Sequence, residues 1–141
     1  MSDPSAVLRA LATQLRDEDT PISPHVVDSS EDPALGLLVA SGPRAVRAPA
    51  EYALVIEAVR EGYLLHYGKA RLLAGHDADL ALLAGDYLYA LGIERLAALG
   101  DAKAVHELAD LIGLCAQLHT EGREDEVASR WRQAVRAIGG R

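Results

Sequence analysis

Hydrophobic residues recur every three or four positions along most of this chain, as they do on one face of a helix. The connections after residue 68 are short, which is typical of antiparallel helices that pack as neighbours. The 141 residues are enough to bury one core. We therefore predict an all-α fold, a single domain over residues 1–141 that forms a bundle of about five helices. The first covers residues 2–17, the second runs from residue 49 to near 68, the third ends at Gly100, the fourth ends at the break at residues 121–122, and the last covers residues 124–138.

The most apolar stretch is residues 80–93, LALLAGDYLYALGI, in which Asp86 is the one charged residue. A helix that is apolar on every side is normally enclosed by other helices. The stretch is too short to span a bilayer, which takes about 20 apolar residues. We predict that it is the central helix of the bundle, and that Gly85 and Gly92 let a neighbouring helix approach closely.

Polar residues mark the expected helix ends. Ser2, Asp3 and Pro4 are typical of a first helical turn, Asp77 or Asp79 can cap the central helix, and Asp101 can cap the next one. In the last helix, the residues expected to face inward are Val127, Trp131, Val135 and Ile138.

Residues 18–48 differ from the rest of the chain, because they contain four prolines and a polar run at residues 28–32. We predict a long irregular arm between the N-terminal helix, residues 2–17, and the helical core, residues 49–138. Its apolar island at residues 34–40 is either a short helix or an extended piece, lying on its own bundle or on another chain. Residues 69–73 are compatible with a short extra helix.

Half of the residues are hydrophobic, yet the chain has no Phe and one Trp, so the core must consist of Leu, Ala, Val and Ile. The net charge of -7 argues against nucleic acid as a partner. The single cysteine, Cys115, excludes an internal disulfide and is expected to be a buried small hydrophobe. No signal peptide or membrane span is predicted, and we expect a cytoplasmic protein.

Asp86 is the sharpest candidate site residue, because a carboxylate among apolar neighbours is costly unless it is hydrogen-bonded or paired. It is either a ligand-binding or acid–base group, or a structural acid that pairs with an arginine, lysine or tyrosine or caps a neighbouring helix. Around it, the residues that could line a pocket or simply supply large core side chains are Tyr63, Tyr67, Tyr87, Tyr89 and His66.

No metal site, cofactor site or catalytic residue is predicted. Helical metal sites usually carry Glu-x-x-His on facing helices, whereas Glu57 and Glu61 are followed by His66 on a different side of the helix. No phosphate-binding loop occurs, and Cys115 has no base placed beside it by the sequence.

One segment is similar to a known family. Residues 83–88, LAGDYL, followed by Ala90 and by residues 96–97, resemble a core helix of the polyprenyl diphosphate synthase superfamily. The match to the small, non-catalytic subunit of heptaprenyl diphosphate synthase is closer and covers residues 79–118. The resemblance implies an all-helical protein that packs beside a catalytic prenyl synthase and helps to shape its chain-length pocket.

Catalytic members of that superfamily carry aspartate-rich motifs that hold magnesium and diphosphate, and no Asp-Asp-x-x-Asp occurs here. The resemblance therefore implies a catalytically silent relative whose partner is a synthase subunit or a further copy of itself. Two alternatives stay open: a helical component of another complex, with the arm wrapped around a partner, and a small-molecule-binding bundle with a pocket near Asp86. The accessory-subunit hypothesis predicts an apolar face left exposed after the bundle forms.

Overall fold

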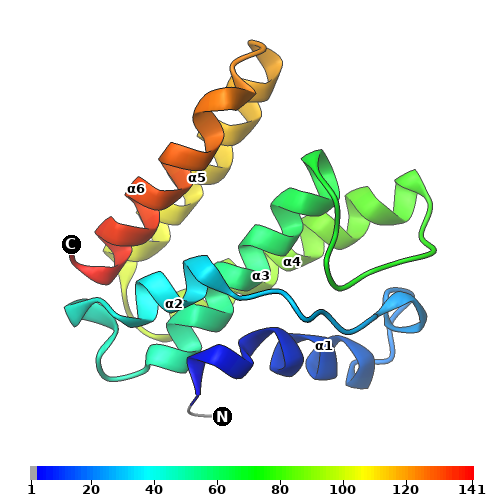
Figure 1. The fold of residues 1–141 in the computed structure, drawn as a ribbon, viewed down its shortest axis with the longest axis horizontal. Helices are drawn as coiled ribbons and strands as arrows, with labels where there is room; N and C mark the ends of the chain where they lie inside the picture. The colour runs from blue at the N-terminus through cyan, green and yellow to red at the C-terminus, as the bar shows by residue number, and fades with distance from the viewer. Residues whose placement is uncertain (1–2) are drawn as a thin grey trace.

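A computed structural model describes residues 3–141. The N-terminal helix was predicted to begin at Ser2, which lies outside the described residues. The described chain is all-α, as predicted, and has one isolated β-bridge but no strand (Figure 1). Its helices are α1 (Val7–Asp17), α2 (Ala34–Ala40), α3 (Pro49–Tyr67), α4 (Ala78–Ala98), α5 (Ala102–Thr120) and α6 (Val127–Gly139). Single 3-10 turns are η1 (Pro4–Ala6), η2 (Ser23–His25), η3 (Pro43–Ala45) and η4 (Glu124–Glu126).

The central helix is α3, which packs against α1, α2 and α4 and is buried on nearly every side. The prediction that residues 80–93 form the enclosed helix is wrong, because Leu82 and Leu83 of α4 are 55% and 66% exposed. The enclosed position of α3 was not predicted because of two glutamates. Glu57 and Glu61 make α3 look half polar in the sequence, yet both are buried in an internal ion cluster described below.

Two hydrophobic clusters lie on different sides of α3. One fills the space between α2, α3, α5 and α6 and includes Leu96 of α4. Its largest fully buried members are Trp131, Ile56, Leu96, Leu108, Leu118 and Ile138. The other joins α1, α3 and α4 with the segment that precedes α4, and its largest buried members are Leu11, Leu15, Leu72 and Leu88. The four residues predicted to face inward from the last helix are all buried, which confirms that prediction.

Glycines allow α3 and α4 to cross at close range, as predicted. A methyl group at Gly62 would lie 2.8 Å from the carbonyl oxygen of Gly85, and one at Gly92 would overlap the side chain of Val59. No larger residue fits these positions without a shift of one helix, so the two backbones are set against each other with little freedom.

The predicted caps are present. The side chain of Asp3 caps η1, Asp77 rather than Asp79 caps α4, and Asp101 caps α5, each by accepting a backbone N–H. In α4 and in α5, the cap satisfies one of the amide groups that a helix start leaves without an intrahelical partner.

Residues 69–73 are irregular, with bends at Arg71 and Leu72, so the short helix considered there does not form. Instead, they pair with the arm: the amide of Val27 donates to the carbonyl of Leu72 at 2.8 Å, and the amide of Ala74 donates to the carbonyl of His25 at 3.0 Å. The apolar island of the arm is the short helix α2, which packs on α3 and α6 of its own chain.

Helices α5 and α6 form a hairpin that projects from the rest of the molecule (Figure 1). At its base, α6 packs on α2 and α5 packs on α4. No helix within residues 3–141 combines the length and the apolar character that a membrane crossing requires.

Candidate functional site

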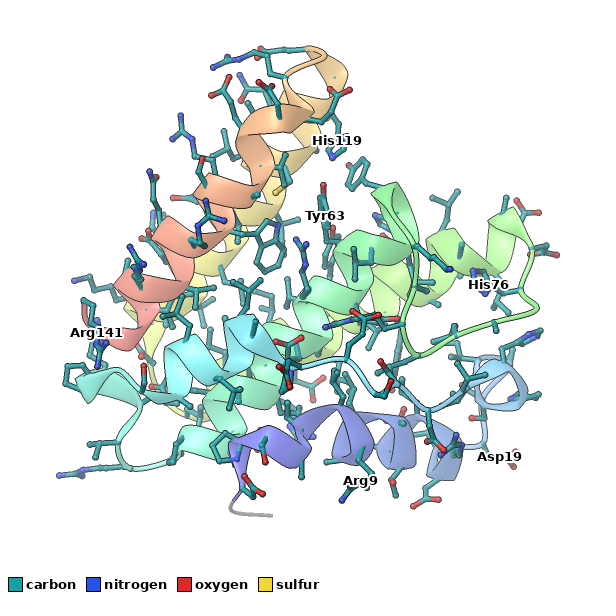
Figure 2. All side chains as sticks on the ribbon, viewed as in Figure 1. Arg9, Asp19, Tyr63, His76, His119 and Arg141 are labelled. Atoms are coloured by element: carbon teal, nitrogen blue, oxygen red, sulfur yellow. The ribbon has the colours of Figure 1, made fainter. Side chains whose placement is uncertain are left out.

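Aromatic and histidine side chains meet where α3, α4 and α5 adjoin. The Tyr63 hydroxyl shares a 2.7 Å hydrogen bond with Nε2 of His119, and the ring of Tyr67 stacks on His119 with centroids 4.1 Å apart. The ring of His66 meets Tyr89 edge-on at 5.2 Å. Figure 2 shows Tyr63 and His119 facing each other across the gap between α3 and the hairpin. We call these five residues the aromatic cluster.

Four of the five residues proposed from the sequence to surround a pocket belong to this cluster, and Tyr87 does not. Its hydroxyl donates to Oε2 of Glu18 at 2.7 Å, on the side of α4 that faces α1. Burial and the hydrogen bond to Glu18 raise the pKa of Tyr87 to about 12. Sequence reasoning missed His119, which comes from α5 and is distant in the chain.

Asp86 lies on the surface, because its side chain is 73% exposed. Its Oδ1 is 3.3 Å from Nε2 of His66, and the same nitrogen is 3.1 Å from the carbonyl oxygen of Leu82. Both neighbours of Nε2 are hydrogen-bond acceptors, so this nitrogen is placed to donate to them. The enclosed carboxylate inferred from the sequence is therefore not found, and Asp86 contacts a histidine rather than an arginine, lysine or tyrosine.

The most buried charges were not identified as a site from the sequence. Glu57, Glu61 and Arg71 have side chains that are 1%, 0% and 8% exposed. The Arg71 guanidinium donates to Oε1 of Glu57 at 2.7 Å and to Oε1 of Glu61 at 2.9 Å. We call these three residues the ion cluster. A sequence signal was present, since two acids four residues apart lie within a helix rich in apolar residues.

Backbone amides complete the hydrogen bonding of the ion cluster. Gly36 donates to Oε2 of Glu57 at 2.7 Å, while the amides of Arg71 and Leu72 each donate to Oε2 of Glu61 at 2.8 Å. Every carboxylate oxygen thus has a partner, as a buried charge requires. The ion cluster attaches both the arm and residues 69–73 to α3.

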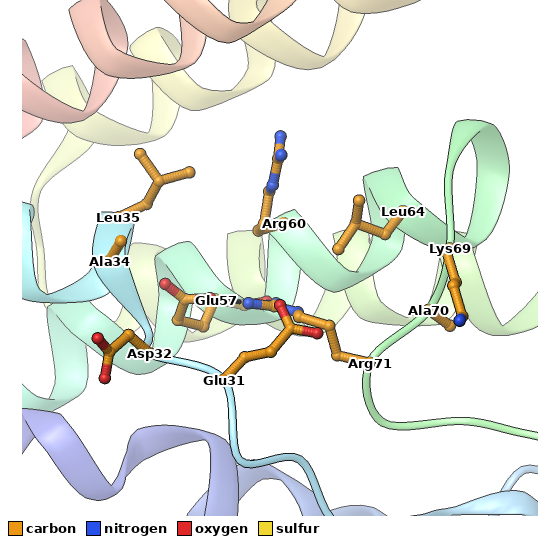
Figure 3. Close-up of a pocket in the computed structure, with 10 residues that line it drawn as sticks. All are labelled: Glu31, Asp32, Ala34, Leu35, Glu57, Arg60, Leu64, Lys69, Ala70 and Arg71. Carbon is orange, nitrogen blue, oxygen red and sulfur yellow. Dashed lines mark hydrogen bonds and ion pairs between the residues drawn. The ribbon is translucent and has the colours of Figure 1, made fainter.

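A cleft of about 480 Å³ opens beside the ion cluster, between α2, α3 and residues 69–71 (Figure 3). The residues that line it include Leu35, Glu57, Arg60, Leu64, Lys69 and Arg71. Gly62 and His66 are on the side of α3 that faces α4. Arg60 lies two residues before Gly62, and Leu64 lies two residues before His66. At about 100° per residue, they therefore project from nearly the opposite side of α3. The cleft is thus separate from Asp86.

Cys115 is buried, as predicted, and burial raises the pKa of its thiol. A thiol with a raised pKa is a poor nucleophile at neutral pH. Within residues 3–141, no group of three or more His, Cys, Asp and Glu side chains is arranged to hold a metal ion.

The outward face of α4 carries apolar and acidic side chains together. Leu82 and Leu83 are the most exposed large apolar residues on the helix, and the acidic residues Asp86 and Glu94 are also exposed. Tyr67, at the end of α3, is also 39% exposed. Two adjacent leucines near the start of α4 are therefore open to solvent.

No protein-family model, curated protein or solved structure matches this chain.

Proposed function

We propose that this protein is a catalytically silent helical accessory subunit that acts by protein–protein association, with a catalytic polyprenyl diphosphate synthase as its partner. The observation that carries the proposal is the exposure of Leu82 and Leu83, 55% and 66%, on α4. This helix lies within the segment that resembles the small subunit of heptaprenyl diphosphate synthase.

Burial of these leucines in an interface is energetically favourable. Full burial of a leucine side chain is worth roughly 1.5–3 kcal/mol, and the exposed part of this pair supplies a fraction of that. The glycine contacts between α3 and α4 hold the helix in place, so little conformational entropy is lost when a partner binds it.

The arrangement of the acids also supports a non-catalytic role. The two carboxylates closest together in the core, Glu57 and Glu61, already accept hydrogen bonds from Arg71 and from backbone amides. Asp86 of the LAGDYL segment is at the surface and contacts His66. In this proposal, Asp86 lies at the rim of the interface, where a charge contributes more to specificity than to affinity.

The test is co-expression of this chain with each polyprenyl diphosphate synthase of the same organism that carries aspartate-rich motifs. Size-exclusion chromatography with light scattering would reveal a complex, and product chain length would be measured with and without this chain. We expect a stable hetero-oligomer in which Leu83→Glu abolishes association. Leu37→Glu is the matched control, because Leu37 is 39% exposed on α2, away from the proposed surface.

Neither substitution is expected to lower the melting temperature of the isolated chain, since both side chains are exposed. Failure of every synthase to bind would contradict the proposal. Equal loss of binding in Leu83→Glu and Leu37→Glu would overturn the assignment of α4 as the interface. Self-association that depends on Leu83 would replace the synthase with a second copy of this chain.

A further inference from the structure

We propose that the cleft between α2, α3 and residues 69–71 binds a small organic anion through Arg60, which would contact a carboxylate or phosphate group. This inference is independent of the proposed function, because the cleft and α4 lie on different sides of α3.

Arg60 carries a charge that the protein does not pair. Its guanidinium carbon is 5.1 Å from the ring centroid of Tyr63 and 5.2 Å from that of Trp131. Across residues 3–141, no acceptor forms a hydrogen bond or an ion pair with this side chain. The aromatic rings stabilise the cation, but its five N–H donors have no acceptors among residues 3–141.

The other half-buried arginines are all paired. Arg71 contacts Glu57 and Glu61, Arg95 contacts Glu51 at 2.6 Å, and Arg130 is 3.9 Å from Glu126. A partly buried guanidinium without an anion is costly, and burial lowers the pKa of Arg60 accordingly. An external carboxylate or phosphate would satisfy the donors in the fork geometry that suits both groups.

The cleft has the size and the walls for such a ligand. Its volume of about 480 Å³ is in the range typical of small-molecule sites, roughly 300–1,000 Å³. Leu35 and Leu64 provide apolar surface, and Lys69 adds a second cation that has no ion pair in residues 3–141. The adjoining ion cluster is fully hydrogen-bonded, so the cleft has a rigid base.

Acidic residues restrict how the anion can lie. Glu31 and Asp32 also line the cleft, and Figure 3 shows Arg60 extending toward the α5–α6 hairpin, in the opposite direction from them. Repulsion from these carboxylates would direct the anionic end of a ligand to Arg60 and leave its apolar part beside Leu35 and Leu64. The site would therefore favour one compact anionic group over a polyanion.

Trp131 is the only tryptophan of the chain and stands beside Arg60, so its fluorescence reports on the site. Inorganic phosphate, acetate and hexanoate would each be titrated into the full chain, with sodium chloride adjusted to hold ionic strength constant. We expect a saturable change in emission with at least one probe. Tighter binding of hexanoate than of acetate would identify an apolar carboxylate as the ligand class, and preference for phosphate would identify a phosphate.

Three variants test the role of Arg60, with isothermal calorimetry as the readout because substitution beside Trp131 changes the emission itself. Arg60→Gln should weaken binding at least tenfold, and Arg60→Lys should retain part of it. Arg9→Gln is the matched control, since Arg9 is an exposed arginine of α1 without an ion pair in the described chain. Thermal melts would confirm that each variant is folded, and Arg60→Lys serves as the test if Arg60→Gln is not.

The inference is overturned if no probe binds saturably at constant ionic strength. It is also overturned if Arg60→Gln, or Arg60→Lys in its place, binds as tightly as Arg9→Gln and the unmodified protein. Neither result would affect the association experiment on α4, so the two proposals can fail separately.

Discussion

Arg71 and Glu61 are joined twice: the backbone amide of Arg71 donates to Oε2 of Glu61 at 2.8 Å, and its Nε donates to Oε1 at 2.9 Å. Ten residues separate them in the chain, and both side chains are buried. The pair fixes the path of residues 69–73 along α3. Residues 69–71 form one wall of the cleft, and the backbone groups of Leu72 and Ala74 pair with the arm.

Arg71→Met should destabilise the fold by about 3–5 kcal/mol, because it leaves Glu57 and Glu61 buried without their cation. Urea denaturation followed by circular dichroism would measure the loss. Arg16→Met is the control, since the Arg16–Asp28 pair is 3.0 Å long but its side chains are 41% and 78% exposed. The control should cost less than about 1 kcal/mol, and equal losses would contradict the importance of the ion cluster.

Gly62→Ala and Gly113→Ala should have opposite effects, although both place alanine within a long helix. The new methyl group at Gly62 would lie 2.8 Å from the backbone oxygen of Gly85, and we expect a loss of about 1–3 kcal/mol. At Gly113 nothing lies within 4 Å, so the higher helix propensity of alanine should stabilise by about 0.5–1 kcal/mol. Denaturation midpoints of the two variants, compared with the parent, check the signs.

Asp101 should make the fold acid-sensitive. Burial alone would raise its pKa, but hydrogen bonds from Tyr52 and Ala104, together with Arg44, lower it below its ordinary value of 3.8. A lowered pKa means that the folded state binds the proton more weakly than the unfolded state. The stabilisation is therefore complete above pH 3.8 and is lost as pH falls through the lower, folded-state pKa.

Asp101→Asn distinguishes the contribution of this carboxylate to the pH dependence of stability from that of the other acidic residues. Asparagine still caps α5, so the expected loss of about 1–2 kcal/mol near pH 7 comes from the weaker contacts with Arg44 and Tyr52. The difference between variant and parent should shrink below pH 3.8 in urea titrations. A difference that stays constant with pH would show that the charge of Asp101 is not responsible.

Asp86→Asn should change the free energy of unfolding by less than about 0.5 kcal/mol, because the side chain is 73% exposed and its one ion pair within residues 3–141 is with His66. Thermal unfolding of the variant is the measurement. A loss above about 2 kcal/mol would be typical of a buried acid and would contradict the surface position described here.

Tyr63→Phe should loosen the attachment of the hairpin to α3. It removes the 2.7 Å hydrogen bond to His119 and should cost about 1 kcal/mol, with faster amide exchange near the end of α5. Tyr67→Phe is the comparison, because Tyr67 stacks on the same imidazole but its hydroxyl has no hydrogen bond in the described chain. Equal exchange rates in the two variants would exclude the hydrogen bond as the attachment.

Local patterns in the sequence determined the helices themselves. Apolar spacing predicted five of the six α-helices, and the polar residues Asp77 and Asp101 marked where two of them begin. Gly85 and Gly92 indicated a close helix contact, and four residues of α6 were expected in the core and lie there. Each of these features depends on neighbours within one or two turns, which the sequence contains explicitly.

Only the tertiary structure decided which helix is enclosed and which charged side chains are buried. Sequence periodicity counted Glu57 and Glu61 as polar and α4 as apolar all round, so it placed the wrong helix at the centre. Arg71 pairs with both acids from a segment that follows α3, and this contact, together with backbone amides, allows α3 to be buried. Whether a charged residue is buried depends on where its partner folds, and that partner belongs to no local pattern.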